Sequence, residues 1–388
     1  MLFYCLIRRL RNIFKILNMS KISADTIKII VSRLQEKKTT KIHAFLGFDA
    51  CIDNIVRVIK NKKENIDPEF YTNSRQFGEF LISRENKSCG IELQTQVSKI
   101  GGNMVITGNA LGNLGIQVDC VGTFGLPDIL PIFNSMSSNC KLHTVGETIT
   151  TTALEFNDAK VMMFDLGPYD KLEWNGIKNR LGTDQIKRLI SGKQLVSFLN
   201  WSEIQNSSLI WKGILDEVIS LMPPSEVRPY FFIDFSDCSR RSKEEIRSAI
   251  ALLVRFQNYF KVIISLNQNE AEIIAKSLDL PDNDSDEDFI KMLCGHCGAD
   301  ELVIHRTKDA LAYDGISFEK CDTFFCNEPT ILTGGGDNFN AGFCFARIYD
   351  FNLFQSLIVA NALSGYYVRY GKSPDVDNLI EFLKAIKS

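Results

Sequence analysis

Short runs of apolar residues recur along the chain, and segments with helical periodicity separate them. Apolar runs bounded by turn residues are typical of strands buried in a sheet. One helical segment opens with a capping box, Ser-Lys-Glu-Glu, at Ser242. Strands that alternate with helices predict an α/β fold, with a mostly parallel sheet and helices on both faces. The predicted strands span residues 42–48, 117–121, 194–199, 230–235, 261–266 and 301–305, and the predicted helices span 183–191, 207–220, 242–258, 269–278 and 286–294.

Two segments follow a different pattern, in which apolar and polar residues alternate strictly. In one of them, residues 91–98, Ile, Leu, Thr and Val alternate with Glu, Gln, Gln and Ser. In the other, residues 150–156 and 160–164 predict a hairpin. Strict alternation indicates a strand with one dry face and one wet face. We therefore expect a small antiparallel sheet that acts as a lid, with segments near 54–62, 88–100 and 148–166.

Composition and charge exclude several classes of protein. The chain has 388 residues, of which 45% are hydrophobic and 23% charged, as in ordinary globular proteins. Lys and Arg number 44 against 47 Asp and Glu, so no cationic surplus favours a nucleic acid or a membrane as partner. The 11 Cys have no repeating spacing and are typical of reduced thiols in a cytoplasmic protein. No apolar run approaches the roughly 20 residues that span a bilayer.

The first 18 residues stand apart from the rest, because they contain four basic residues and no acidic one. Their apolar residues lie at near-helical spacing, which fits a membrane-surface helix or a targeting peptide. The alternative, which we prefer, is that translation starts at Met19 and that the stretch before it is either a gene-calling artefact or a mobile extension. We assign residues 1–40 to an N-terminal extension with a leading helix, and residues 41–388 to one domain with its lid.

A glycine-rich motif near the C-terminus carries the clearest chemistry. Gly334, Gly335 and Gly336 precede Asp337, and a helical pattern follows. Glycines let several backbone N–H groups turn toward one point, and the start of a helix adds its positive end, so the motif predicts an anion hole. Phosphate repels a carboxylate beside that hole, but the carboxylate can accept the proton of a hydroxyl that attacks phosphorus. A glycine-rich turn with a capping Asp and no chemistry fits the same residues.

Three motifs in order give a resemblance to a known family. The residues GGGDNFNAGF at 334–343 resemble the C-terminal signature of the ribokinase-like (PfkB) carbohydrate kinases. GGNMVITGNALGNLG at 101–115 resembles their N-terminal signature, and the residues from Asn267 to Glu270 resemble their N-x-x-E motif. Asp234 and Asn361 fit two further family positions. The resemblance covers about residues 41–388 and implies a ribokinase-like fold.

The resemblance also implies a reaction and the residues that perform it. The reaction is ATP-dependent phosphorylation of a hydroxyl of a small sugar or nucleoside, with Mg²⁺ held through water by Glu270. Asp337 is the implied catalytic base, and Asp53 is favoured over Asp49 as the contact to substrate hydroxyls. A homodimer is plausible by resemblance alone. The implied anion hole is Gly334, Gly335 and Gly336, the implied nucleotide-binding residues are Asn267, Glu270, Arg306, Thr307 and Asn361, and the implied substrate-binding residues are Asp53, Asp49, Gly101, Gly102 and Asn103.

Departures from the family pattern leave other interpretations of the function open. Ile331 replaces a family Asp, which puts a monovalent cation site in doubt, and Ile106 replaces a family Asn. The family's nucleotide turn falls on residues 305–310, where both glycines are missing, so Arg306 or Lys308 would contact phosphate by charge. The alternative function is a catalytically inactive protein that binds nucleotide or sugar. ADP is the alternative phosphate donor.

Overall fold

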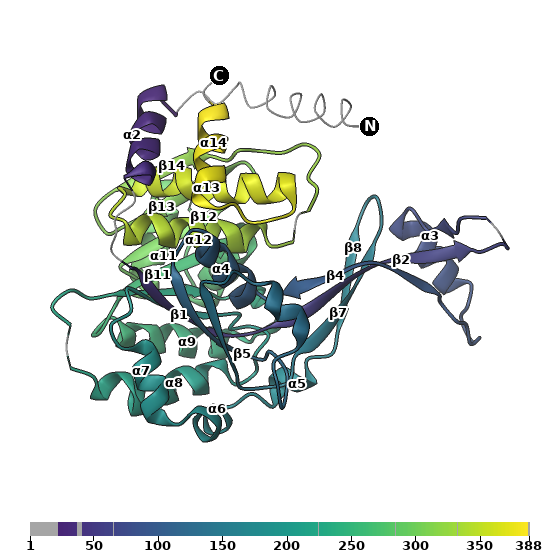
Figure 1. Ribbon diagram of the computed structural model, residues 1–388, viewed down its shortest axis with the longest axis horizontal. Coiled ribbons are helices and arrows are strands. Elements are labelled where there is room, and N and C mark those ends of the chain that lie inside the picture. The colour runs from purple at the N-terminus through teal and green to yellow at the C-terminus, as the bar shows by residue number, and fades with distance from the viewer. Residues whose placement is uncertain are drawn as a thin grey trace.

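A nine-stranded sheet forms the centre of the protein (Figure 1). The computed structural model describes residues 22–36, 41–64, 66–223, 225–283, 285–331 and 333–386, so the stretch 1–18 lies outside the described residues. The strand order is β14-β13-β12-β11-β10-β9-β1-β5-β6. The strands from β12 to β6 run parallel, and β13 and β14 add an antiparallel edge. The strands are β1 (His43–Phe48), β5 (Gln117–Gly122), β6 (Cys140–Thr144), β9 (Leu195–Leu199), β10 (Tyr230–Asp234), β11 (Lys261–Asn267), β12 (Glu301–His305), β13 (Asp309–Tyr313) and β14 (Phe318–Asp322).

Helices cover both faces of this sheet, which confirms the predicted α/β architecture. Ala44 and Leu46 of β1 belong to one apolar core, and Phe45 and Phe48 belong to the other, so the strand is buried on both sides. The first core is completed by α2 (Ala24–Gln35), α4 (Asn103–Asn113), α12 (Gly335–Ile348), α13 (Leu353–Tyr370) and α14 (Val376–Ile386). The second is completed by α5 (Gly167–Asp170), α6 (Trp174–Leu181), α7 (Thr183–Ile190), α8 (Ser207–Glu217), α9 (Lys243–Phe256), α10 (Gln268–Ser277) and α11 (Asp286–Cys297). Short 3₁₀ helices occupy Pro131–Ser135, Ile219–Leu221 and Cys238–Arg240.

A smaller sheet projects from the main body as the predicted lid (Figure 1). Its strand β2 pairs antiparallel with β4 and parallel with β7, so the lid sheet is mixed and not purely antiparallel. The predicted hairpin is the antiparallel pair β7 and β8. The sequence did not predict α3 or β3, which also belong to the lid. The lid elements are β2 (Cys51–Asn61), β3 (Glu69–Phe70), α3 (Ser74–Ile82), β4 (Leu93–Gly101), β7 (Ile149–Glu155) and β8 (Lys160–Phe164).

The lid has an apolar core of its own on the face that α3 covers. Val56 and Val58 of β2 pack there with Leu154 of β7 and with Tyr71 and Phe77. The side chain of Asn73 accepts hydrogen bonds from the first backbone N–H groups of α3, which fixes where that helix begins. One face of the lid sheet is thus covered by α3, and the opposite face carries the residues that the site uses.

The leading helix α2 is packed into the main body. Its residues Ile27 and Ile30 are buried in the first core. Arg33 donates a hydrogen bond to the backbone oxygen of Tyr349 at 2.9 Å and lies 4.3 Å above the ring of Phe351. Residues 24–35 are therefore continuous with the domain that was predicted to start at residue 41. No helix in the described part of the chain is both long and apolar enough to cross a bilayer.

We expect Asp119 to stabilise the fold in a pH-dependent way. Its burial opposes ionisation, but hydrogen bonds from His143 (3.0 Å) and Lys193 (2.6 Å) outweigh it and lower the pKa of Asp119 from 3.8 to about 2. Because the pKa of Asp119 is lower in the folded state, its ionised carboxylate stabilises the fold at pH values above the ordinary pKa. This stabilisation is lost as the pH falls from about 4 to about 2. Urea unfolding of Asp119→Asn should show a free energy about 2 kcal/mol below wild type at pH 7. If the difference in the free energy of unfolding between wild type and Asp119→Asn did not become smaller by pH 3, this account would be contradicted.

Candidate functional site

The glycine turn leads directly into helix α12, as the motif predicts. Gly334 has φ of +95°, a left-handed conformation that favours glycine, and α12 begins at the next residue. A Cβ on Gly334 would lie 2.7 Å from the Tyr367 hydroxyl oxygen, so the turn also has no room for a side chain. Helix α4, which carries the N-terminal signature, packs against α12, and the Thr107 hydroxyl lies 3.5 Å from the backbone oxygen of Asp337. The two signatures thus meet at one place.

Asp337 is the third residue of α12 and lies at the mouth of the turn. Its Oδ1 is inaccessible and has no hydrogen-bond partner among the described residues. Burial, followed by the charges of Asp234, Asp49 and Asp53, raises the pKa of Asp337 well above its ordinary value. Because four carboxyl groups share this region, Asp337 needs positive charge nearby to be ionised at neutral pH.

The predicted substrate-binding residues gather on the other side of Asp337, where β1 passes into β2. The two carboxylate oxygens of Asp49 accept the backbone N–H groups of Asn103 (2.6 Å) and Met104 (2.9 Å), at the start of α4. Burial, partly offset by these bonds, raises the pKa of Asp49 to about 6. Gly102 has φ of +98° and precedes that helix. Asp49 thus holds α4 in place.

Asp53 is the carboxylate that remains available to a ligand on this side of the site. It is 5% exposed, and a Cβ on Gly101 would lie 2.7 Å from its carboxyl group. Burial raises the pKa of Asp53, and the charge of Lys99 opposes that shift. Asp49 is occupied by the start of α4, whereas Asp53 interacts with the Cys51 thiol at 3.7 Å and with Thr151, and its contact to substrate stays a prediction.

Two lysines from the lid enter the site, and the sequence analysis missed both. Lys99 lies on β4 directly across from Asp53 on β2. Lys160, at the start of β8, donates a hydrogen bond of 3.4 Å to the Thr333 hydroxyl, next to the glycine turn. On the same side of the site, Arg240 lies 4.9 Å from the ring of Phe164 on β8. The lid therefore contacts the main body over the site and brings positive charge to it.

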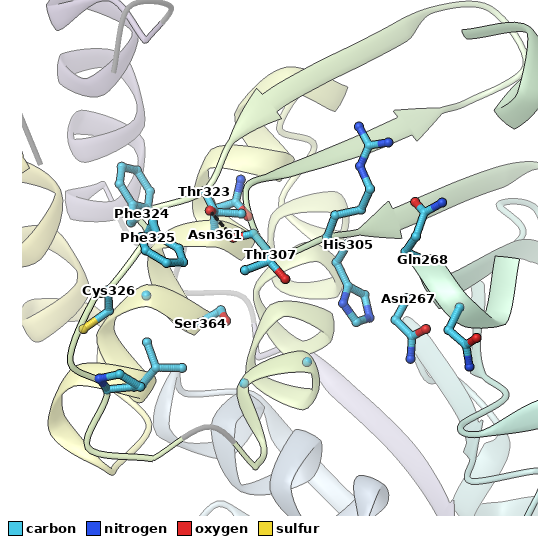
Figure 2. Close-up of a pocket in the computed structure, with 17 residues that line it drawn as sticks. Asn267, Gln268, His305, Thr307, Thr323, Phe324, Phe325, Cys326, Asn361 and Ser364 are labelled. Carbon is cyan, nitrogen blue, oxygen red and sulfur yellow. Dashed lines mark hydrogen bonds between the residues drawn. The ribbon is translucent and has the colours of Figure 1, made fainter. Parts of the chain in front are cut away.

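A cavity of about 500 Å³ adjoins the glycine turn on the side away from the lid (Figure 2). Its wall joins the ends of β11 and β12 to α12, α13 and the segment after β14. Most of the predicted nucleotide-binding residues line it, and they come from segments that are far apart in the sequence. They are Asn267, Arg306, Thr307 and Asn361, together with Gly335 and Gly336 of the anion hole.

His305, the first residue of the predicted nucleotide turn, also faces this cavity. Figure 2 shows its ring near Asn267, and its Nε2 is inaccessible without a hydrogen-bond partner in the described part of the chain. A Cβ on Gly336 would lie 3.3 Å from the His305 ring, which places the imidazole beside the glycine turn. Burial lowers the pKa of His305 to about 4, so the ring is neutral at pH 7.

Arg306 lines the cavity but is already engaged in ion pairs. Its guanidinium donates to both carboxylate oxygens of Asp286, at 2.8 and 3.0 Å, and also to Asp309. These hydrogen bonds raise the pKa of Arg306 further. The side chain of Asn361 donates to the backbone oxygen of Asp322 at 3.3 Å. Both residues are held rigidly at the wall of the cavity.

Asn267 and Glu270 form a capping box at the start of α10. Glu270 accepts the backbone N–H of Asn267 at 2.8 Å and its side-chain amide at 2.6 Å. Burial, and then the charge of Asp234, raise the pKa of Glu270 to about 9. A divalent cation in this region would relieve the repulsion between the two carboxylates. Within the described residues, no group of three or more His, Cys, Asp or Glu is placed to hold a metal ion.

Comparisons with known proteins identify relatives that cover most of the chain. A ketohexokinase of Haloferax volcanii is 26% identical over 340 residues, which cover 87% of this chain and 89% of that protein. The structure of Arabidopsis thaliana ribokinase with ribose and ATP matches with a TM-score of 0.61 at 14% identity, over 89% of this chain and 99% of the other. A Burkholderia thailandensis nucleoside kinase in complex with inosine matches with a TM-score of 0.57 at 14% identity, over 88% and 98%.

The fold and the family relationship define a ribokinase-like (PfkB) carbohydrate kinase. The family relationship supports a sugar kinase activity. The profile of the prokaryotic ketohexokinase family matches residues 24–386, and the chain belongs to that family.

We expect Gly334→Ala to lose activity. The substitution places a Cβ 2.7 Å from the Tyr367 hydroxyl at a φ of +95°, so the turn must move and its N–H groups lose their direction. Misplacing such donors should lower kcat by roughly 10²-fold or more in a coupled assay for ADP. Gly295→Ala is the matched control, because that helical glycine has nothing within 4 Å of the added Cβ. Full turnover by Gly334→Ala would contradict the assigned role of the turn.

Proposed function

We propose that this kinase transfers the γ-phosphoryl group of ATP to a hydroxyl of a ketohexose such as fructose. The position of Asp337 carries this proposal. It follows the glycine turn at the start of α12, with an unpartnered Oδ1. The family supports a ketohexose as the acceptor. The cavity of about 500 Å³ beside Gly335 and Gly336 supports a nucleotide as the donor.

In the proposed reaction, the acceptor hydroxyl lies between Asp53 and Asp337. Asp337 accepts the proton of that hydroxyl as its oxygen forms a bond to the γ-phosphorus. The bond from the γ-phosphorus to the β,γ-bridging oxygen breaks, and ADP leaves with the electron pair. The backbone N–H groups at Gly334, Gly335 and Gly336 donate to the phosphoryl oxygens in transit and stabilise their charge.

Positive charge must accompany the substrates, because the carboxyl groups of the site repel one another. Glu270 would hold Mg²⁺ through water, and the ion would neutralise the phosphates of ATP. Asn267 keeps Glu270 in place for that role. Lys160 reaches the glycine turn from the lid at Thr333, where its charge adds to that of the N–H groups. Each of these charges favours the ionised form of Asp337.

Asp337→Asn should abolish most of the turnover and leave sugar binding intact. The amide cannot accept the proton, and loss of a general base costs roughly 10²–10⁴-fold in kcat. The measurement is Mg²⁺-dependent ADP formation, with fructose, other ketohexoses, ribose and nucleosides tested separately. ADP in place of ATP, with AMP as the measured product, tests the alternative donor.

Asp128→Asn, in an exposed loop, is the control for that substitution and should behave as wild type. Two outcomes would contradict the proposal. If Asp337→Asn kept its kcat, the base would be a different residue. If no acceptor gave turnover while ATP or a sugar still raised the melting temperature of wild type, the protein would be a binder without catalysis.

We infer that two copies of the chain associate through their lids. A row of apolar residues crosses the lid sheet, in which Val97, Ile55, Ala153 and Met162 lie opposite one another on adjacent strands. Ile55 and Ala153 are buried, whereas the two ends of the row are exposed, Val97 by 45% and Met162 by 37%. Exposed apolar residues at the edges of a small sheet favour a protein partner.

Light scattering coupled to size-exclusion chromatography should give the mass of a dimer for wild type. Val97→Lys combined with Met162→Glu should give a monomer, because each places a charge in the contact. Ile316→Lys is the matched control, since this apolar residue is 89% exposed between β13 and β14 in the main body. A monomeric wild type at micromolar concentration would refute the association.

A further inference from the structure

Lys99 occupies a place in the site that the proposed reaction does not use. It is the third residue from the end of β4, two residues before Gly101. In the register of the lid sheet it lies opposite Asp53 on β2, and Asp53 lies opposite Thr151 on β7. Residues opposite one another on adjacent strands share a face of the sheet. Lys99 and Asp53 therefore point to the same side, which is the side away from α3.

The ammonium group of Lys99 lacks a partner. Its Nζ is inaccessible and makes no hydrogen bond within the described residues. It lies near enough to Asp53 and Asp337 to be attracted by both, and it is repelled by Lys160. A buried ammonium has three N–H donors, and leaving them unpaired is costly, so such groups are normally satisfied. The position of this one, between the substrate contact and the base, points to a ligand.

We propose that Lys99 binds the acceptor sugar, donating a hydrogen bond to the hydroxyl oxygen next to the one that Asp53 holds. A carboxylate only accepts hydrogen bonds and an ammonium only donates them. Two neighbouring hydroxyls of a sugar can satisfy both, because each has one O–H and two lone pairs. This assignment rests on the proposed function, and it makes Lys99 a specificity-determining residue for the acceptor.

A role that is only electrostatic is the competing explanation. Lys99 could balance the charge of Asp53 without touching the sugar. In that case its removal would weaken all sugars equally, whether or not they carry the second hydroxyl. A direct hydrogen bond makes a different prediction, because the loss then depends on one oxygen of the ligand.

The test compares Lys99→Met with Lys99→Arg and with Lys62→Met. Lys62 lies after β2 in the same lid, is exposed, and pairs with Glu92 at 2.7 Å, so it is the matched control. Calorimetric titration measures the sugar Kd, and steady-state kinetics measures kcat and both KM values. Lys99→Met should raise the sugar Kd and KM by about 10- to 100-fold, with the KM for ATP unchanged. Lys99→Arg should recover part of the affinity, and Lys62→Met should match wild type.

A set of monodeoxy ketohexoses identifies the contact. For wild type, one of them should bind at least about 10-fold more weakly than the parent sugar, and in Lys99→Met that difference should vanish. The assignment of Lys99 would be overturned if Lys99→Met lost the same affinity for every sugar. It would also be overturned if Lys99→Met had the melting temperature and the sugar Kd of wild type. If the assignment of Lys99 failed but wild type still bound and phosphorylated a ketohexose, the proposed function would stand. Wild type that binds no sugar contradicts both proposals.

Discussion

The concentration of negative charge beneath the lid is the constraint on which the rest of the site depends. The charges of Asp234, Asp49 and Asp53 all raise the pKa of Asp337, and the charge of Asp337 in turn raises the pKa of Glu270. Burial alone would keep these carboxyl groups protonated. At Asp49, which holds the start of α4, hydrogen bonds to the carboxylate partly offset the rise in pKa that burial causes. At Asp337, the proposed base, the charge of Lys99 lies close enough to favour the ionised form.

The fold brings these charges together because parallel strands end at the same edge of the sheet. Asp234 ends β10 and Asn267 ends β11, and both lie beside the start of α12. The side chain of Asn340 on α12 donates to Asp234 at 2.6 Å and accepts from Ser265 at 2.6 Å. This buried network fixes the helix that carries Asp337 to the central strands. Asp337 is therefore positioned by the central sheet, and the two lysines near it come from the lid.

Much of the fold could be predicted from the sequence, because the apolar runs are short and well separated. The strand at 301–305 coincides with β12, and the helix expected at 242–258 is α9, Lys243–Phe256. The glycine turn and Asp337 were predicted because their chemistry lies in consecutive residues. Lys99 and Lys160 were not, because their convergence depends on the register between strands that are distant in sequence. Asn267 and Glu270 show a second limit of sequence analysis, because one pattern can fit two roles. The spacing that suggested binding of phosphate and Mg²⁺ also forms the capping box of α10.

The lid strand β2 begins at Cys51, three residues after β1 ends at Phe48, so the lid continues a central strand of the sheet. Lys99 and Lys160 travel with that lid, whereas Asp337 does not. If the lid were raised, the carboxyl group of Asp337 would lose the nearby positive charge of Lys99 and would hold its proton more tightly. Under the proposed reaction, a water molecule in such an open site would meet a protonated Asp337. Hydrolysis of ATP in the absence of a sugar would then be suppressed.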